Sequence, residues 1–219
     1  MADAALWRRI ERYAAAEDPL TGASNRLALI VASNQPFYPL YVWWATGAAH
    51  PLLALTFLST PSFLAAPWIA RRFPEIGRLW FPAVGALNTL FCARIFGEAS
   101  GVLLFLLPCL VIAALSCRPS QWRALAIYMT GVVLSLAMLR NGFGTPPYPS
   151  TPAQDASLFA LNAYSAATLS VIAAWMLYRP RREGSGAAAR CGVTRDGGDS
   201  ADERAPDHVE GCHENRPVT

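Results

Sequence analysis

Lysine is absent from this chain, and charged residues of any kind are scarce. All 18 basic residues are arginines, and only 15% of the 219 residues are charged, against about a quarter in ordinary soluble domains. The arginines stand in small groups between apolar runs, whereas nucleic-acid binding needs a dense basic stripe. Hydrophobic residues make up 53% of the chain. This composition excludes an ordinary soluble domain and a nucleic-acid-binding protein, and it predicts a membrane protein.

Recognisable catalytic and metal-binding motifs are also missing. The sequence contains no glycine-rich phosphate loop, no nucleophile elbow and no HExxH motif. Of the three histidines, His50 alone lies near the apolar runs, which argues against a haem held between two membrane helices. Cys191, His208, Cys212 and His213 have the residue types of a zinc site, but their spacing is not that of known zinc fingers. We therefore expect no enzymatic activity, no cofactor and no metal.

Long apolar runs are what the sequence does have. Six of them approach the ~20 residues that a helix needs to cross about 30 Å of hydrocarbon. A transmembrane barrel would instead show segments of about 10 residues with alternating polarity. The predicted fold is all-α, a polytopic bundle of six transmembrane helices within residues 20–179. The predicted spans are Leu27–Gly47, Leu52–Ala70, Leu79–Phe96, Gly101–Cys117, Trp122–Arg140 and Ala156–Tyr178.

Different segments flank this region on either side. In Ala4–Ala16, Leu6, Trp7 and Ile10 recur at helical spacing, with arginines on the opposite side. Residues 1–19 are therefore predicted to form an amphipathic helix that lies in the headgroup region of a bilayer. Residues 180–219 are rich in Gly, Asp, Glu and Arg. Such a segment buries too little apolar surface to fold, so we expect a disordered cytoplasmic tail.

The distribution of arginines predicts the orientation of the bundle. Two arginines, Arg94 and Arg140, fall in connections on the side opposite the N-terminus. Many more fall on the side of the N-terminus, and cytoplasmic loops are the ones enriched in basic residues. We therefore expect both termini to be cytoplasmic, in the inner membrane of a bacterium. The arginines on the N-terminal side are Arg8, Arg9, Arg12, Arg26, Arg71, Arg72, Arg78, Arg118, Arg123, Arg179, Arg181 and Arg182.

The predicted topology brings several polar residues to the outer face. They are His50, Arg94, Glu98, Arg140 and Asp155. Two interpretations are open. The two arginines could bind a carboxylate or phosphate, since guanidinium groups pair with such anions through two hydrogen bonds. Alternatively, Arg94 and Glu98 form an i,i+4 pair on one helix, and the other residues contact water or headgroups.

Three amide side chains are placed near the middle of the predicted spans. Asn34 and Gln35 lie in the first span and Asn88 in the third. An amide in hydrocarbon needs a partner, so they could hold the two helices together by hydrogen bonds. The alternative is a site for a small polar ligand beside the backbone freed at Pro36 and Pro39. Spans without a central charged residue argue against an ion-coupled pump.

Two segments carry a loose resemblance to a known class of membrane domain. NQPFYPLYVWW (Asn34–Trp44) and FGEASGVLLFLLPC (Phe96–Cys109) resemble the six-helix sensor domains at the N-termini of bacterial diguanylate cyclases, adenylate cyclases and histidine kinases. The resemblance covers residues 26–179 and implies a membrane-embedded sensor. The positions that match are Gly97, Gly101, Phe105 and Pro108.

The resemblance ends after Tyr178, where no cyclase or kinase sequence follows. We therefore expect a sensory or interaction module of the lipid bilayer that binds a small ligand, a lipid or a partner protein. Its output would pass to a separate signalling protein or through a homo-oligomer. A small transporter or permease subunit is the alternative function, and a structural subunit of a larger membrane complex is a third.

Overall fold

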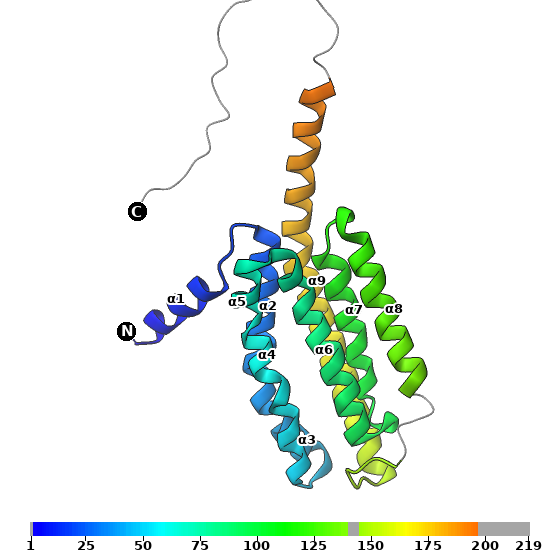
Figure 1. Ribbon diagram of the computed structural model, residues 1–219. Helices are drawn as coiled ribbons and strands as arrows, with labels where there is room; N and C mark the ends of the chain where they lie inside the picture. Colours follow the sequence, from blue (N-terminus) through cyan, green and yellow to red (C-terminus); the bar gives the residue numbers. More distant parts are fainter. Residues whose placement is uncertain (1, 140–144, 197–219) are drawn as a thin grey trace, which may run out of the picture. The chain divides into compact units, whose positions relative to one another are not determined.

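The computed structural model describes residues 2–139 and 145–196, and all regular secondary structure in these two ranges is helical. The chain divides into a unit of residues 1–185 and a unit of residues 186–219. Helices of the first unit run up and down to form a bundle (Figure 1). The all-α prediction is confirmed for the described residues.

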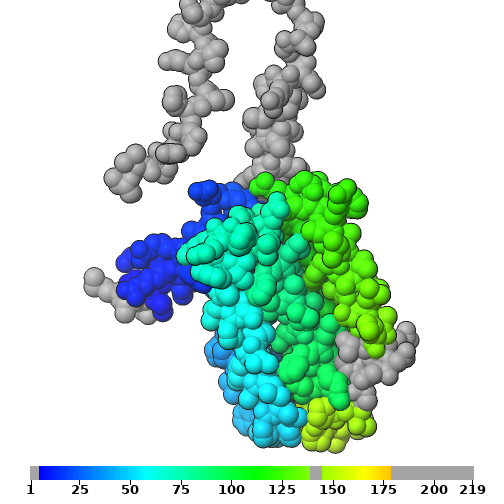
Figure 2. Space-filling view, in the orientation of Figure 1, coloured from blue at the N-terminus to red at the C-terminus, as the bar shows by residue number. Residues whose placement is uncertain are grey.

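The chain begins with an amphipathic helix that stands out from the side of the bundle (Figure 2). This helix, α1, spans Ala2–Ala14, and the prediction placed it two residues later. Leu6 and Trp7 are 60% and 62% exposed. Its last turn is fixed to the bundle, because the Tyr13 hydroxyl donates a hydrogen bond to the Leu64 carbonyl at 2.7 Å. The exposed apolar face is the one that the sequence predicted for a membrane surface.

Asp18 starts the next helix eight residues earlier than predicted. Its side chain accepts hydrogen bonds from the backbone N–H groups of Leu20 and Thr21, as a helix N-cap does. Pro19 occupies the first helical position, where its missing N–H costs nothing. The helix therefore begins eight residues before the predicted apolar span Leu27–Gly47, because hydropathy marks the span and not this cap.

From there the helical backbone continues without a break to Thr46. The three segments are α2 (Pro19–Asn34), the 3-10 turn η1 (Gln35–Phe37) and α3 (Tyr38–Thr46). The tighter turn lies at Pro36, and Pro39 follows in the first turn of α3. Prolines lack the N–H that would continue the α-helical pattern. The run ends at Gly47, which has φ 68° in the left-handed region that glycine adopts without strain.

Prolines also divide the second predicted span. The pieces are the 3-10 helix η2 (Pro51–Ser59), α4 (Thr60–Leu64) and α5 (Ala66–Arg72). Each of the three has a proline at one of its first two positions. The following helix, α6 (Pro74–Phe96), is long and contains Pro82. A Cβ atom added at Gly77 would lie 2.5 Å from Cα of Ala70, so α5 and α6 approach closely only because residue 77 has no side chain.

The remaining elements complete the bundle. They are the 3-10 turns η3 (Glu98–Ser100) and η4 (Val102–Phe105), α7 (Leu106–Ser116), η5 (Pro119–Gln121), α8 (Trp122–Leu139) and α9 (Pro152–Asp196). Gly97 and Gly101 flank η3 at φ 80° and 72°. They therefore act as helix-terminating residues rather than as a close-packing pair on one helix.

Helix α9 continues well beyond Tyr178, where the sixth span was predicted to end. Residues 180–196, assigned to a disordered tail, are helical. Extending an existing helix needs no new nucleus, and the run Ala187–Arg190 consists of good helix formers. Residues 197–219, with His208, Cys212 and His213, lie outside the described residues.

Three helical stretches in the described part of the chain are long and apolar enough to cross a membrane. They are Pro51–Arg72, Pro74–Phe96 and Pro152–Tyr178. Val102–Ser116 is apolar but shorter. By this criterion, three spanning helices stand where the sequence predicted six. The first predicted span is not among them although Pro19–Thr46 is helical throughout, because Asn34, Gln35, Pro36 and Pro39 lower the hydropathy of that run.

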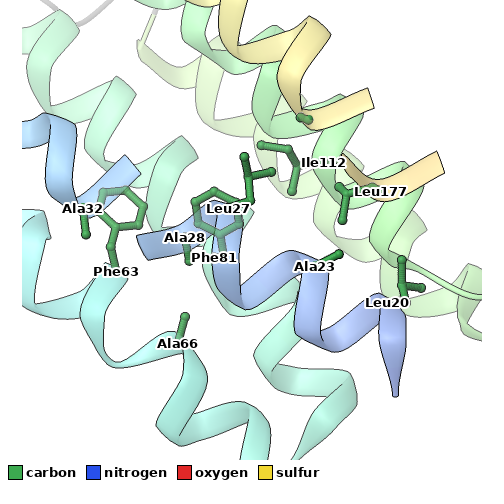
Figure 3. Packing of buried hydrophobic residues seen from close by; sticks show 11 residues of the cluster. Leu20, Ala23, Leu27, Ala28, Ala32, Phe63, Ala66, Phe81, Ile112 and Leu177 are labelled. Atoms are coloured by element: carbon green, nitrogen blue, oxygen red, sulfur yellow. The ribbon is translucent and has the colours of Figure 1, made fainter. Parts of the chain in front are cut away.

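A buried apolar cluster fixes the bundle near the end where α2 begins. It brings together Leu27 of α2, Phe63 of α4, Phe81 of α6, Ile112 of α7 and Leu177 of α9 (Figure 3). A second cluster joins Val42, Phe96, Tyr148 and Leu158, which belong to α3, α6, the segment before α9, and α9. These two clusters determine how the helices surround the space between them.

Candidate functional site

A cavity of about 660 Å³ lies inside the bundle. Its wall is built from α2, η1, α3, η2, α4, α6, η4, α7 and α9. This volume falls in the range of small-molecule binding sites, about 300 to 1,000 Å³. Segments far apart in the sequence therefore enclose one space of ligand size.

All three amides predicted in the middle of the spans line this cavity. Asn34 ends α2, Gln35 begins η1, and Asn88 lies on α6. No hydrogen bond joins the first span to Asn88 among the described residues. Gln35 donates from Nε2 to the Ser59 hydroxyl at 2.9 Å instead. The expectation that these amides bond α2 to α6 is wrong, because they border a cavity rather than a tight contact.

The amide oxygens of Asn34 and Asn88 already have donors. The Tyr41 hydroxyl donates to Asn34 Oδ1 at 3.5 Å, and the Cys92 thiol donates to Asn88 Oδ1 at 3.9 Å. Because each amide oxygen receives the donated hydrogen, the Nδ2 group of each asparagine is not used in these two contacts. The two Nδ2 groups consequently point elsewhere, and neither has a partner among the described residues.

Aromatic and aliphatic side chains form the rest of the lining. Phe63 and Phe81 meet edge to face, with ring centroids 5.8 Å apart, and Phe105 and Ile112 add further apolar surface. No Asp, Glu, Arg or His is found among the described lining residues. The cavity therefore suits an uncharged ligand with a large apolar part.

The mouth of the cavity is marked by lining residues that are exposed. Phe37 is 50% exposed, Tyr41 40% and Tyr164 78%. They belong to η1, α3 and α9, so the opening lies on the side of the bundle rather than at one of its ends. A ligand would enter between helices.

A buried amide on α9 holds the wall in place. Asn162 is fully buried, accepts a hydrogen bond from the Tyr38 hydroxyl at 3.1 Å and donates from Nδ2 to the Ser100 carbonyl at 2.9 Å. It thereby links α3 and η3 to α9. Sequence analysis overlooked Asn162, although the argument that singled out Asn34, an amide in the middle of an apolar run, applies to it equally.

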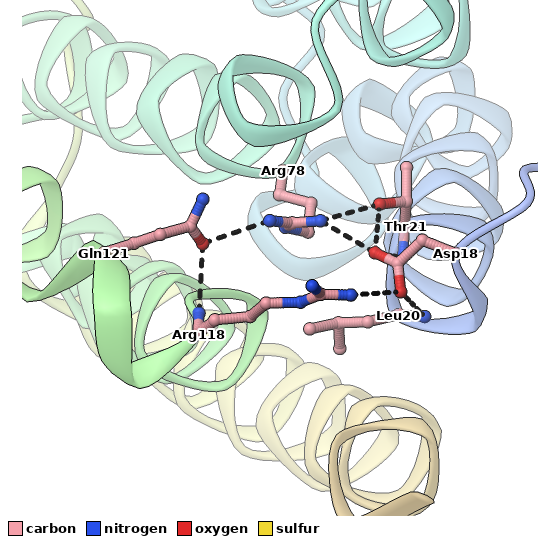
Figure 4. A network of polar contacts seen from close by, with 6 residues as sticks. All are labelled: Asp18, Leu20, Thr21, Arg78, Arg118 and Gln121. Atoms are coloured by element: carbon pink, nitrogen blue, oxygen red, sulfur yellow. Dashed lines mark hydrogen bonds and ion pairs between the residues drawn. The ribbon is translucent and has the colours of Figure 1, made fainter. Parts of the chain in front are cut away.

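A second polar site closes the end of the bundle where α2, α6 and η5 meet (Figure 4). Arg78 of α6 is 3% exposed, and its Nη1 lies 2.7 Å from Asp18 Oδ2 and 2.9 Å from Thr21 Oγ1. Its Nη2 donates to Gln121 Oε1 at 3.0 Å. Arg118 Nη2 approaches Asp18 Oδ1 at 3.1 Å. We call Asp18, Thr21, Arg78, Arg118 and Gln121 the arginine cluster.

Opposing effects determine the ionisation of Asp18 in this cluster. Burial alone raises the pKa of its carboxyl group. The hydrogen bond from Thr21, the positive charges of Arg118 and Arg78, and the Leu20 N–H outweigh burial and lower the pKa below its usual value. Asp18 is therefore a carboxylate at neutral pH. The sequence predicted Arg78 and Arg118 only as markers of topology. It gave no signal that both pair with Asp18, which lies 60 positions before Arg78 and 100 before Arg118.

The residues predicted to form an outer ring have separate roles. Arg94 donates from Nη1 to the Thr145 carbonyl at 3.3 Å. His50 caps η2, since its Nδ1 accepts from the Leu52 N–H at 3.2 Å. Asp155 has an Oδ1 that is buried without a hydrogen-bond partner among the described residues. Arg140 lies outside the described residues, so an anion pocket formed with it stays a prediction.

The predicted i,i+4 pair between Arg94 and Glu98 is wrong. Within residues 5–138 and 145–178, whose side chains the structure describes, the ion pairs join Arg26 to Glu11 and both Arg78 and Arg118 to Asp18. Helix α6 ends at Phe96, and Gly97 turns the chain at φ 80°. Glu98 therefore leaves the helix face that carries Arg94.

Comparison with protein-family models, with curated proteins and with solved structures found no match for this chain. The case for a function consequently depends on the geometry of the cavity and of the arginine cluster.

Proposed function

We propose that this protein is a polytopic membrane protein with six transmembrane segments, and that it acts as a sensory or interaction module by binding a small ligand in the central cavity. The observation that carries this proposal is the cavity itself, about 660 Å³ in volume and lined by Asn34, Gln35 and Asn88. Polar groups are costly in an apolar interior unless they have partners. Gln35 already donates to Ser59, so the Nδ2 groups of Asn34 and Asn88 are the ones suited to ligand recognition.

Several features support six segments rather than three. Pro19–Thr46 is helical throughout, so two segments too short by themselves give one long enough to span. Helix α8 has 18 residues, and large apolar side chains such as Ile127 (75%) and Met138 (79%) are exposed along it. An apolar surface of this kind is stable against lipid and unfavourable in water.

The ends of the bundle differ in charge as the proposed orientation requires. The links from α1 to α2, from α5 to α6 and from α7 to α8 lie at one end (Figure 1). Arg71 and Arg72 end α5 beside the second link, Arg118 lies in the third, and Arg118 pairs with Asp18 of the first. We propose that this end faces the cytoplasm of a bacterium with both termini, as arginine-rich connections do. Reporter fusions at each terminus test this; reporters active on opposite sides would contradict it.

Ligand binding is tested by extraction with native lipids followed by mass spectrometry. Ser165 lines the cavity, and Ser165→Leu fills part of it. Ser157, also on α9, is exposed outside the cavity, so Ser157→Leu is the matched control. We expect a small molecule that copurifies with the wild type and with Ser157→Leu but is depleted in Ser165→Leu. Identical small molecules in all three preparations would refute binding in the cavity.

A small permease is the second candidate function. Non-helical or broken backbone beside a cavity is typical of transporters, and η1 and η2 interrupt the α-helical pattern at the wall. The uncharged lining argues for a neutral solute. Solute uptake by proteoliposomes separates the two functions, since a sensor gives no flux. For the sensory role we propose a separate signalling protein or a second copy of the chain as the partner, with no catalytic step in this chain.

A further inference from the structure

We infer that the ligand of the cavity is an uncharged, membrane-dissolved molecule with a flat ring system and a carbonyl group that accepts hydrogen bonds from Asn34 and Asn88. This inference rests on the proposed function, because it names the ligand class for the same cavity. Three properties of the lining lead to it: its charge, its unused hydrogen-bonding groups and its shape.

The charge of the lining excludes an ionised ligand. The described wall contains no acidic or basic side chain, and an ion moved from water into such a space loses its hydration without gaining a counter-ion. The two guanidinium groups of the arginine cluster are already paired with Asp18. A neutral molecule is the ligand that this wall can hold.

The unused donors define the polar group of the ligand. Because Tyr41 and Cys92 donate to the oxygens of Asn34 and Asn88, the Nδ2 groups of both amides remain to be satisfied. They can only donate. A carbonyl oxygen, which only accepts and has two lone pairs, complements two such donors better than a hydroxyl group, which brings a donor of its own.

The apolar part of the wall favours a flat ring. The rings of Phe63, Phe81 and Phe105 all line this space, and the first two pack edge to face at 72°. Aromatic rings pack against one another through offset or edge-to-face contacts. A planar molecule can use these surfaces without the loss of conformational freedom that a flexible chain would incur.

The route of entry explains why the ligand should come from the membrane. The exposed residues at the mouth, Phe37, Tyr41 and Tyr164, lie on the side of the bundle. In the proposed orientation this side is in contact with lipid. A molecule that is dissolved in the bilayer reaches the cavity directly, whereas a water-soluble solute has to cross the headgroup region first.

Fluorenone and fluorene provide the test. The two molecules are both flat and uncharged, and they differ in the carbonyl group that fluorenone carries. Binding is measured by equilibrium dialysis on the full chain in phosphatidylcholine nanodiscs, with empty nanodiscs subtracted. A fluorenone carboxylate serves as the charged probe. The variants are Asn34→Leu, Asn88→Leu, Ser165→Leu and the control Ser157→Leu.

We expect the wild type to bind fluorenone more tightly than fluorene and not to bind the carboxylate. Each asparagine substitution should weaken fluorenone binding by about two- to tenfold, the effect of one neutral hydrogen bond, and leave fluorene binding unchanged. Ser165→Leu should weaken both, and Ser157→Leu neither. The infrared carbonyl stretch of fluorenone should shift to lower frequency on the wild-type protein, which reports the hydrogen bond even where a variant does not fold.

The outcomes separate the two proposals. If Ser165→Leu weakens both probes but the asparagine variants treat them alike and the carbonyl stretch does not shift, the ligand class is wrong while binding in the cavity stands. The ligand class is also wrong if neither neutral probe binds, or if the carboxylate binds as well as fluorenone. If both neutral probes bind and Ser165→Leu alters neither, the cavity is not the site, and the proposed function fails with it.

Discussion

Asp18→Asn is the substitution that most directly tests the arginine cluster. It removes the negative charge that both Arg78 and Arg118 approach, and it keeps a good N-cap for α2, because asparagine caps helices about as well as aspartate. A loss of stability can therefore be assigned to the charge. The guanidinium group of Arg78 would stay buried, with its side chain 4% exposed, and its Nε has no partner in the described structure.

The magnitude follows from the burial of the two ion pairs. Removing one partner of a fully buried pair costs about 3 to 5 kcal/mol. The side chain of Asp18 is 22% exposed, so water screens the pair in part. Arg118 is 55% exposed, and an exposed pair contributes about 0 to 1 kcal/mol. Together these values predict that Asp18→Asn lowers the free energy of unfolding by about 2 to 4 kcal/mol.

Reversible unfolding in mixed detergent micelles, followed by circular dichroism, measures this difference. Labelling of the buried thiols of Cys92 and Cys109 gives an independent readout of opening. The matched control is Glu11→Gln, which breaks the exposed pair with Arg26 and should cost less than about 1 kcal/mol. An Asp18→Asn variant no less stable than Glu11→Gln would refute the argument that the cluster stabilises the fold.

Three further predictions concern titration and packing. The folded-state pKa of Asp18 is lowered from 3.8, so the stability that its charge contributes is complete above pH 3.8 and is lost as the pH falls through the folded-state pKa. Thermal melts at decreasing pH should therefore show a loss of stability in the wild type that Asp18→Asn lacks. Asn162→Leu should destabilise the fold by about 1 to 3 kcal/mol, measured by the same unfolding assay, because the hydroxyl and carbonyl that it pairs with stay buried. Gly101→Ala should destabilise by at least about 1 kcal/mol, since its φ is 72° and an added Cβ would lie 2.7 Å from Phe159. Gly131→Ala, with no atom within 4 Å of an added Cβ, is the control and should be neutral or slightly stabilising in the same melts.

The sequence predicted the helical class and the approximate positions of most helices because hydropathy is a local property. Runs such as Pro74–Phe96 and Pro152–Tyr178 exceed the length needed for a span, and no distant contact is required to identify them. Helix starts were less predictable. Asp18 caps α2 through its own backbone neighbours, but the hydropathy of the next eight residues is too low to mark a membrane helix.

The candidate site also has a part that the sequence predicts and a part that it does not. An amide within an apolar run is unusual by itself, so Asn34, Gln35 and Asn88 could be singled out without knowledge of their surroundings. Whether they bond to each other or border a cavity depends on how tightly α2, α6 and α9 pack, and that is set by side chains such as Phe63 and Phe81 from other segments.

The arginine cluster shows the limit of local reasoning most clearly. Arg78 follows the same pattern as the exposed arginines near it, one basic residue at the end of an apolar run. It is distinguished by the carboxylate of Asp18, which comes from 60 positions earlier in the chain, and by Gln121, 43 positions later. A buried guanidinium is tolerated only where such partners converge. The burial of Arg78 is therefore a property of the packed bundle, and a rule that counts arginines along the chain treats it as one more topology marker.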